Sequence, residues 1–459
     1  MADRPATCVI GAGISGLTAG KALGDHAVPY TCFEASDGIG GNWYFANPNG
    51  RSSAYRSLHI DTSRDCISFR DMPMGPEYPD YPHHSEILEY LNRYADAFGL
   101  RERIRFRTPV EHAERMPAGG WRITTGDGDT HEFDFLVVGN GHHWDPRYPA
   151  FPGHFDGETL HSHHYLSPTE PLDLTGKRVL VVGIGNSAVD ITSELSRRGV
   201  AERVILSTRS GAWVIPKYVF GRPTDQVVKT SPLLPLKLQR FVARPFPRLV
   251  SGRMEDFGLP QPNHGFLEAH PTVSSELLLR LGSGDAVAKP NVAELEGDRV
   301  RFEDGSVERV DAIVYATGYR ISFPFFDEDF LAAPDNRLPL FKRVFKPGID
   351  DLAFIGFAQT VPTLFPFVEL QSKLVARYAS GEYALPPKSE IEEAIRADQD
   401  KHAGHFADRP RHTMQIEWYS YEHDLKHREI PAGHERALRG EAARLAGRAA
   451  RDEEAAAVA

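Results

Sequence analysis

Cysteine is nearly absent from this sequence. Only Cys8, Cys32 and Cys66 occur among 459 residues, and no two of them form a C-x-x-C pair. A dithiol redox centre, a zinc site and a disulfide scaffold are therefore excluded as organising features. A chain of this length buries about three-quarters of its surface without such cross-links. We expect a globular protein of two to three domains that is stabilised by its hydrophobic core.

Long apolar runs and an excess of positive charge are also missing. No run reaches the ~18 residues of a membrane helix, and the first apolar segment, at residue 7, is too short for a signal peptide. The net charge is −11, and no dense Lys/Arg cluster offsets it, which disfavours a nucleic-acid partner. The neighbouring histidines His161, His163 and His164 have no cysteine or paired acid beside them, so no metal site is predicted. A cytoplasmic protein without a transmembrane anchor is expected.

Glycine, in contrast, recurs in a specific pattern at two places. "TCVIGAGISG" begins at residue 7 and "RVLVVGIGNSAVD" begins at residue 178. Each segment joins a β-branched apolar run to a stretch with helical periodicity, as in a dinucleotide-binding βαβ unit.

Each glycine of the first segment has a predicted role. Gly11 allows the tight strand-to-helix turn, Gly13 lets the backbone approach a pyrophosphate, and Gly16 lets the helix pack closely on the strand. Gly183 and Gly185 begin the second fingerprint in the same way. We therefore predict two dinucleotide-binding turns in one chain.

The rest of each half repeats the same order of elements. Segments 119–133 and 297–310 read as hairpins, and each precedes a buried-type strand that ends in glycine, at 134–141 and 311–318. The predicted fold class is α/β, with two Rossmann-like domains and the NADPH-binding domain inserted in the FAD-binding domain.

The second strand of each unit ends differently. Glu34 ends the first, eighteen residues after Gly16, where a carboxylate accepts hydrogen bonds from the hydroxyls of an adenosine ribose. "LSTRS" ends the second and offers Arg209 in place of an acid; a guanidinium suits a ribose 2′-phosphate. The first site thus fits FAD or NAD and the second fits NADPH, although a solvated surface arginine is an alternative for Arg209.

Four parts of the chain are predicted. The first part of the FAD-binding domain covers residues 1–165, and the NADPH-binding domain covers 166–315. The second part of the FAD-binding domain, with C-terminal helices, covers 316–432, and a charged Ala-rich tail covers 433–459. Segment 231–262 is an apolar, basic and proline-broken insertion, for which a lid, a membrane-surface patch and a packed loop are all open.

The segment between the two halves carries a motif that points to a family. "FPGHFDGETLHSHHY" contains F-x-G-x-x-x-H-x-x-x-Y at Phe155, Gly157, His161 and Tyr165. This resembles the identifying motif of the class B flavin-containing monooxygenases. "FEASDGIGGNWYF" and the "ATGY" linker are also similar to that family, and the resemblance extends over about residues 7–425.

The resemblance implies an activity. A soluble member of bacterial type would use FAD, NADPH and O2 to oxygenate soft nucleophilic nitrogen or sulfur atoms of small molecules, through a flavin C4a-hydroperoxide. The alternatives are a Baeyer–Villiger-type ketone monooxygenase, an NADPH oxidase or dehydrogenase, and a non-catalytic dinucleotide sensor. The motif ends in Tyr165-Leu166, whereas the Baeyer–Villiger fingerprint ends in Trp followed by Pro or Asp, which disfavours the first alternative. The sequence leaves the oligomeric state open, a homodimer included.

The resemblance also implies site residues. Gly41, Asn42, Trp43 and Thr62 would bind FAD, and Asn186 and Ser187 would begin the NADPH-binding helix. Trp43 could equally be a core aromatic, and Ser187 an ordinary hydroxyl of a first helical turn. His161 and Tyr165 would brace the linker between the domains.

Asp61 departs from the family pattern. Relatives usually have Asn there, at a position that faces the oxygen-reactive edge of the flavin. Asp61 is therefore the predicted catalytic residue; a surface-loop role is the alternative.

Overall fold

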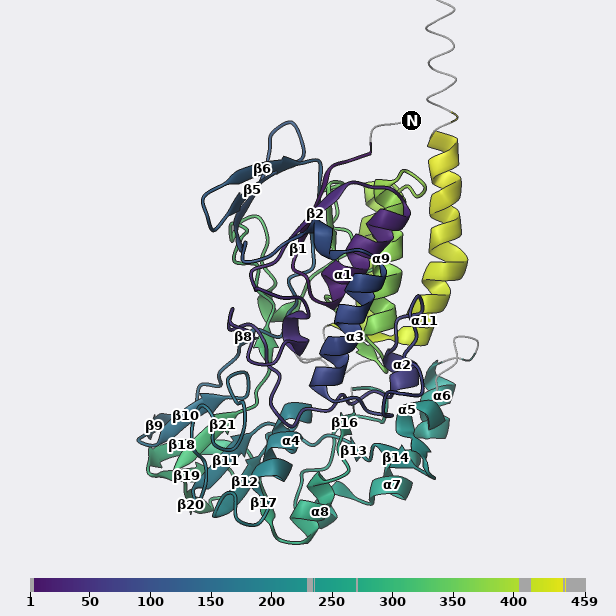
Figure 1. Cartoon of the computed structure of the whole chain (residues 1–459). Helices are drawn as coiled ribbons and strands as arrows, with labels where there is room; N and C mark the ends of the chain where they lie inside the picture. The colour runs from purple at the N-terminus through teal and green to yellow at the C-terminus, as the bar shows by residue number, and fades with distance from the viewer. Residues whose placement is uncertain are drawn as a thin grey trace, which may run out of the picture.

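Two five-stranded parallel sheets form the centre of the molecule. The computed structural model describes residues 4–228, 234, 236–269, 271–403, 414–440 and 442. In Figure 1 the first sheet lies in the upper half with helices α1, α3 and α9, and the second lies in the lower half with α4 and α8.

The first sheet has the order β23-β7-β1-β2-β3. Its strands are β1 (Thr7–Ile10), β2 (Tyr30–Phe33), β3 (Ile104–Arg105), β7 (Phe135–Val138) and β23 (Leu352–Phe354). Every residue of β1 and β7 is buried, as expected for a parallel sheet covered on both faces. The helices of this half are α1 (Ile14–Asp25), α3 (His84–Ala97) and α9 (Phe365–Ala379).

The second sheet repeats the arrangement in the order β10-β21-β11-β12-β17. Its strands are β10 (Glu158–His161), β11 (Arg178–Val182), β12 (Arg203–Ser207), β17 (Ala286–Lys289) and β21 (Ala312–Tyr315). Helix α4 (Asn186–Leu195) connects β11 to β12, as α1 connects β1 to β2, and α8 (Leu277–Gly282) precedes β17.

Both predicted hairpins are present. β5 (Trp121–Thr125) pairs with β6 (Thr130–Phe133), and β19 (Arg299–Phe302) pairs with β20 (Val307–Arg309). Each hairpin gains one more antiparallel strand, β4 (Val110–Arg115) or β18 (Val292–Gly297), and β9 (Gly153–Phe155) pairs with β18.

The path of the chain explains how the halves are joined. β23 belongs to the first sheet but follows every strand of the second, so the second sheet is inserted within the first half. The predicted fold class is confirmed. The exact domain limits stay a proposal: because β9 and β10 pair with β18 and β21, we propose that the inserted domain begins near residue 153, before the predicted 166, and ends at 315.

Shorter elements surround the sheets. They are η1 (Gly41–Trp43), α2 (Arg64–Ile67), η2 (Arg101–Arg103), β8 (Asp145–Pro146), β13 (Val214–Ile215), β14 (Tyr218–Val219), β15 (Arg222–Pro223), α5 (Thr224–Val227), α6 (Leu236–Ala243), α7 (Phe246–Ser251), η3 (Met254–Phe257), β16 (Thr272–Val273), β22 (Tyr319–Arg320), η4 (Pro334–Asn336), β24 (Gln359–Val361), α10 (Lys388–Ala403), β25 (Gln415–Glu417), α11 (Trp418–Asp424) and η5 (Leu425–Glu429).

The predicted insertion and tail are partly described. Segment 231–262 includes α6, α7 and η3; Phe246 packs on Phe266, while Phe241 and Val242 are exposed. Helical structure continues through 430–440, so the first residues of the predicted tail extend the C-terminal helix of Figure 1. Residues 443–459 lie outside the described part.

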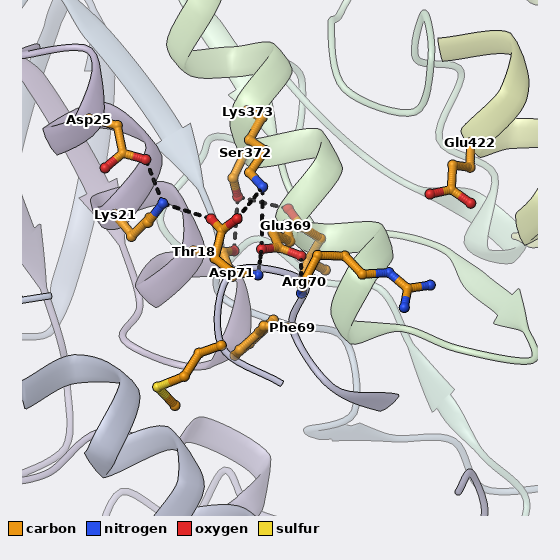
Figure 2. Close-up of polar contacts among 12 residues, drawn as sticks. Thr18, Lys21, Asp25, Phe69, Arg70, Asp71, Glu369, Ser372, Lys373 and Glu422 are labelled. Carbon is orange, nitrogen blue, oxygen red and sulfur yellow. Dashed lines mark hydrogen bonds and ion pairs between the residues drawn. The ribbon is translucent and has the colours of Figure 1, made fainter. Parts of the chain in front are cut away.

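Helices α1 and α9 are joined by a buried network of charges (Figure 2). The Glu369 carboxylate accepts hydrogen bonds from the backbone N–H groups of Arg70, at 2.7 Å, and Asp71, at 2.9 Å. The Asp71 carboxylate in turn contacts Lys21 on α1 at 2.7 Å and Lys373 on α9 at 2.6 Å. Burial raises the pKa of Glu369. For Asp71 the two lysines outweigh burial, so its pKa lies below the ordinary value.

We expect Glu369→Gln to lower the free energy of unfolding by about 1–3 kcal/mol, because the amide NH2 would face a backbone N–H and leave a buried donor unpaired. Urea unfolding of the variant and the parent measures the difference. Glu422→Gln is the control, since Glu422 makes only a partly exposed i,i+4 pair with Lys426, worth about 0.3–0.5 kcal/mol. Equal losses in both variants would contradict the role of the network.

Candidate functional site

The first glycine turn is shaped by close backbone contacts. Gly11 has a φ of +94°, and a Cβ on it would lie 2.9 Å from the carbonyl oxygen of Gly139. A Cβ on Gly16 would lie 1.7 Å from the carbonyl oxygen of Gly11. Both positions therefore require glycine for the packing of α1 against β1 and the end of β7.

Gly13 differs from these two. A Cβ on it would meet only Gly41, at an ordinary 3.6 Å from the Cα, so packing alone does not demand glycine there. Helix α1 begins directly after Gly13, and no side chain caps it. A side chain at position 13 would cover the first backbone N–H groups of α1. Because Gly13 leaves these groups open, the arrangement fits a pyrophosphate.

Glu34 lies next to this turn. Its carboxylate, in a residue only 5% exposed, accepts hydrogen bonds from the backbone N–H of Ala12 at 2.6 Å and of Ser36 at 2.7 Å. Burial raises the pKa of Glu34, and these hydrogen bonds partly oppose the rise. A carboxylate fixed at the glycine turn is placed to accept further hydrogen bonds from a ribose.

The second glycine turn repeats the geometry of the first. Gly183 has a φ of +138°, and a Cβ on it would lie 2.4 Å from the carbonyl oxygen of Ala316, at the end of β21. Helix α4 begins directly after Gly185, again without a side-chain cap. Asn186 Oδ1 accepts a hydrogen bond from Val273 N at 3.1 Å, which ties α4 to β16, and Ser187 lies half-buried on the first turn.

Arg209 lies two residues after the end of β12. From this position a side chain can contact the ribose of a dinucleotide bound at the second turn. Arg209 is exposed, and the Thr208 hydroxyl before it donates to the carbonyl of Ser210. A second guanidinium is near: burial and the charge of Arg209 both lower the pKa of Arg147. Two cations at this edge of the sheet create a positive field that suits a phosphate.

The other residues predicted to bind FAD lie beside the first turn and near the start of α9. Gly41 abuts Gly13, Asn42 Oδ1 accepts from Ser53 N at 2.9 Å, and the Trp43 ring meets Phe365 edge-on at 6.3 Å. The Thr62 hydroxyl donates to the carbonyl of Pro362 at 2.9 Å, just before α9. Asn42, Trp43 and Thr62 are thus each held by a neighbouring residue.

Asp61 lies against the second glycine-turn helix, between the two halves. Its Oδ1 is 3.6 Å from Nζ of Lys217, a residue of the inserted half. Burial first, and then the nearby Asp190 carboxylate, raise the pKa of Asp61 to about 7; Lys217 and Asn186 partly counteract this.

Three members of this cluster were missed from the sequence. Lys217 follows β13, Asp190 lies on α4, and Tyr55 donates a hydrogen bond to Asp190 Oδ2 at 2.5 Å. Burial raises the pKa of Asp190 to about 6. Only the placement of Asp190 one turn after Asn186 hinted that an acid would face the site.

His161 and Tyr165 of the linking motif are buried and have structural contacts. The Tyr165 hydroxyl donates to Glu194 on α4 at 2.8 Å, and the His161 ring packs on Tyr148 and Tyr319. Within the described ranges, no group of three or more His, Cys, Asp or Glu residues is arranged to hold a metal ion.

Two Rossmann-like units, each with its own glycine turn, are typical of an oxidoreductase that binds two dinucleotides. The Flavin-binding monooxygenase-like family matches residues 5–432. The chain therefore belongs to this family.

Curated relatives cover most of the chain. It is 38% identical to the rat flavin-containing monooxygenase 5 over 429 residues, covering 89% of this chain and 79% of that protein. It is 37% identical to the rat dimethylaniline monooxygenase [N-oxide-forming] 2 over 439 residues, covering 91% and 81%. The solved structure of S-allyl-L-cysteine S-oxygenase from Allium sativum matches with a TM-score of 0.69 at 26% identity, covering 94% of this chain and 88% of that one.

These findings confirm the predictions of an enzyme, a flavin monooxygenase with FAD and NADPH as cofactors. In the part of the chain that the structure describes, no helix is long and apolar enough to cross a membrane.

The two glycine turns should fail in different ways. We expect Gly13→Val to yield colourless protein, because the branched side chain fills the space for a pyrophosphate. Gly185→Val should stay yellow but lose the bleaching of the flavin by NADPH. Absorbance spectra of the purified variants, with and without NADPH, measure both effects. Loss of flavin from Gly185→Val alone would mean that the two sites are assigned the wrong way round.

Arg209→Ala should weaken NADPH binding about 10- to 100-fold and leave NADH binding nearly unchanged, because only NADPH has a 2′-phosphate for the guanidinium. Titration calorimetry with NADP⁺ and NAD⁺ measures both affinities. Arg203→Ala, at the other end of β12 and paired with Glu308, is the matched control. Equal weakening of both cofactors would assign Arg209 a structural role.

Proposed function

We propose that this enzyme uses NADPH and O2 to oxygenate soft nucleophilic nitrogen or sulfur atoms of small molecules. The observation that carries the proposal is the pair of uncapped glycine-turn helices, α1 and α4, in a chain of the flavin-binding monooxygenase-like family. A relative named for N-oxide formation and a structural neighbour named as an S-oxygenase support nitrogen and sulfur as the atoms that are oxygenated.

Each half of the chain has its own binding task. The first turn, with Glu34 and Gly41, would hold FAD, and the second turn, with Arg209, would hold NADPH. When bound, the two cofactors supply hydride transfer and oxygen activation. Two strand pairings connect the segments that join the halves: β10 pairs with β21 beside the second turn, and β22 pairs with β8.

The protein must also exclude water from the reacting centre, since water would release the activated oxygen as hydrogen peroxide. Trp43, Phe365 and Phe69 form an apolar wall beside the first turn, with ring centroids 5.0 to 6.3 Å apart. Asp61 is the proposed catalytic residue: the resemblance implies a position at the oxygen-reactive edge of the flavin, and a raised pKa would let the carboxyl donate a proton near neutral pH.

The remaining sequence predictions form part of the proposal. A cytoplasmic location is proposed because the sequence has only three cysteines among 459 residues, too few for a disulfide scaffold. The homodimer stays a prediction.

We expect trimethylamine or a simple thioether to accelerate NADPH oxidation by purified yellow enzyme, and a cyclic ketone to have little effect. Mass spectrometry should find the N-oxide or S-oxide in amounts matching the NADPH consumed. A response to the ketone alone would support the Baeyer–Villiger alternative. NADPH oxidation that yields only hydrogen peroxide with all three compounds would indicate an oxidase.

A further inference from the structure

The cluster around Asp61 contains more acidic than basic side chains. Two carboxylates, Asp61 and Asp190, lie around one ammonium group, Lys217, and the Tyr55 hydroxyl donates to Asp190. Asp61 Oδ1 is shielded from solvent and has no hydrogen-bond partner within the described residues. Two carboxylates that share one cation in a low-dielectric site cannot both be ionised cheaply, so one proton is retained between them.

Lys217 is held firmly in this position. Its Nζ donates to the carbonyl of Ile60 at 3.2 Å, and its backbone N–H donates to Ser275 Oγ at 3.0 Å. The Tyr81 hydroxyl, from the first half, donates to its carbonyl. Lys217 is thus tied to both halves, and its ammonium group faces the carboxyl of Asp61.

The overall reaction of a flavin monooxygenase consumes one proton: NADPH + O2 + substrate + H⁺ gives NADP⁺ + oxygenated product + H2O. The water contains one oxygen atom of O2, the hydrogen that NADPH supplies as hydride, and this proton. The proposed function requires that bulk water be kept from the reacting centre, so we expect the proton to come from a protein group beside that centre.

We propose that the Asp61–Asp190 pair stores this proton, carried on the Asp61 carboxyl, and that Lys217 is the positioning residue that sets how tightly it is held. This inference rests on the proposed function. When the proton leaves, Asp61 becomes a carboxylate beside Lys217, which stabilises the charge until solvent reloads the site. The Asp61 side chain is 18% exposed, which gives solvent a route to reload it.

Other ionisable groups surround the pair. His59 and Tyr81 lie near Lys217, with the Tyr81 ring 5.0 Å from Lys217 Nζ. Glu194 and Glu276 act on Asp190 and raise its pKa. Glu194 accepts from Tyr165, and Glu276 pairs with Arg197 and Arg280, so both acids have partners of their own. Lys217 is the cation in direct contact with Asp61.

The proposal predicts opposite shifts from two substitutions. The measured quantity is hydrogen peroxide formed per NADPH consumed by the holoenzyme between about pH 5 and 10, a window wide enough for shifts of 1–3 units. Below its pKa Asp61 is protonated and peroxide is low; peroxide rises as pH passes through that pKa. Lys217→Met raises the pKa and should move the rise about 1–3 pH units upward. Asp190→Asn removes a negative charge and should move it downward.

Further variants complete the design. Asp61→Asn, which cannot titrate, should flatten the profile, and Lys217→Arg should restore that of the parent. Lys342→Met is the matched control, since Lys342 is 22% exposed against 21% for Lys217 and pairs with Asp424 far along the chain; its profile should overlay the parent's. A purely structural role for Lys217 would lower activity at every pH without moving the midpoint, and that result would overturn the proposal.

A second readout needs no turnover. Infrared titration of the oxidised yellow protein should show a carboxylic-acid signal of Asp61, identified as the signal that is lost in Asp61→Asn. This signal should disappear as pH rises and persist to higher pH in Lys217→Met. A missing acid band in the parent would refute the proton store. A normal band in a protein that oxygenates none of the test compounds would instead refute the proposed function and leave the proton store intact.

Discussion

The close approach of backbone to backbone at the two glycine turns is the constraint on which the rest of the structure depends. A Cβ on Gly11 or Gly183 would strike the carbonyl at the end of the neighbouring strand, so each helix can begin where it does only if these residues are glycine. Because α1 and α4 begin there, their free N–H groups point to the carboxyl edge of a parallel sheet. Both cofactor sites follow from that placement.

The same backbone constraint holds at both glycine turns, but the side chains beside the two turns carry opposite charges. Beside the first turn a buried carboxylate, Glu34, is bound by backbone N–H groups. Beside the second, Arg209 and Arg147 bring positive charge. We propose that the two turns, which share a similar glycine geometry, discriminate between dinucleotides by the charge at the end of one strand.

Buried charge is also used for two different purposes. Around Asp71 and Glu369, two lysines and backbone N–H groups satisfy two carboxylates, and the result is a rigid joint between α1 and α9. Around Asp61 and Asp190 a single lysine serves two acids, which leaves the pair short of positive charge and raises both pKa values. The first arrangement suits stability, and the second suits a group that must exchange a proton.

Sequence alone determined the two Rossmann-like units, the hairpins, the insertion of one unit in the other, and the glycines of both turns, because these depend on local periodicity and on short fixed spacings. It also predicted roles for Glu34 and Arg209, which lie one and two residues after the ends of their strands. The limits of the inserted domain were less accessible, since β9 pairs with β18 and β10 pairs with β21 of the second sheet, and each partner lies more than 130 residues away. Only the tertiary structure brought Asp61 to Lys217 and Asp190, residues more than 120 positions apart, because the contact arises where the two halves meet and no local pattern encodes it.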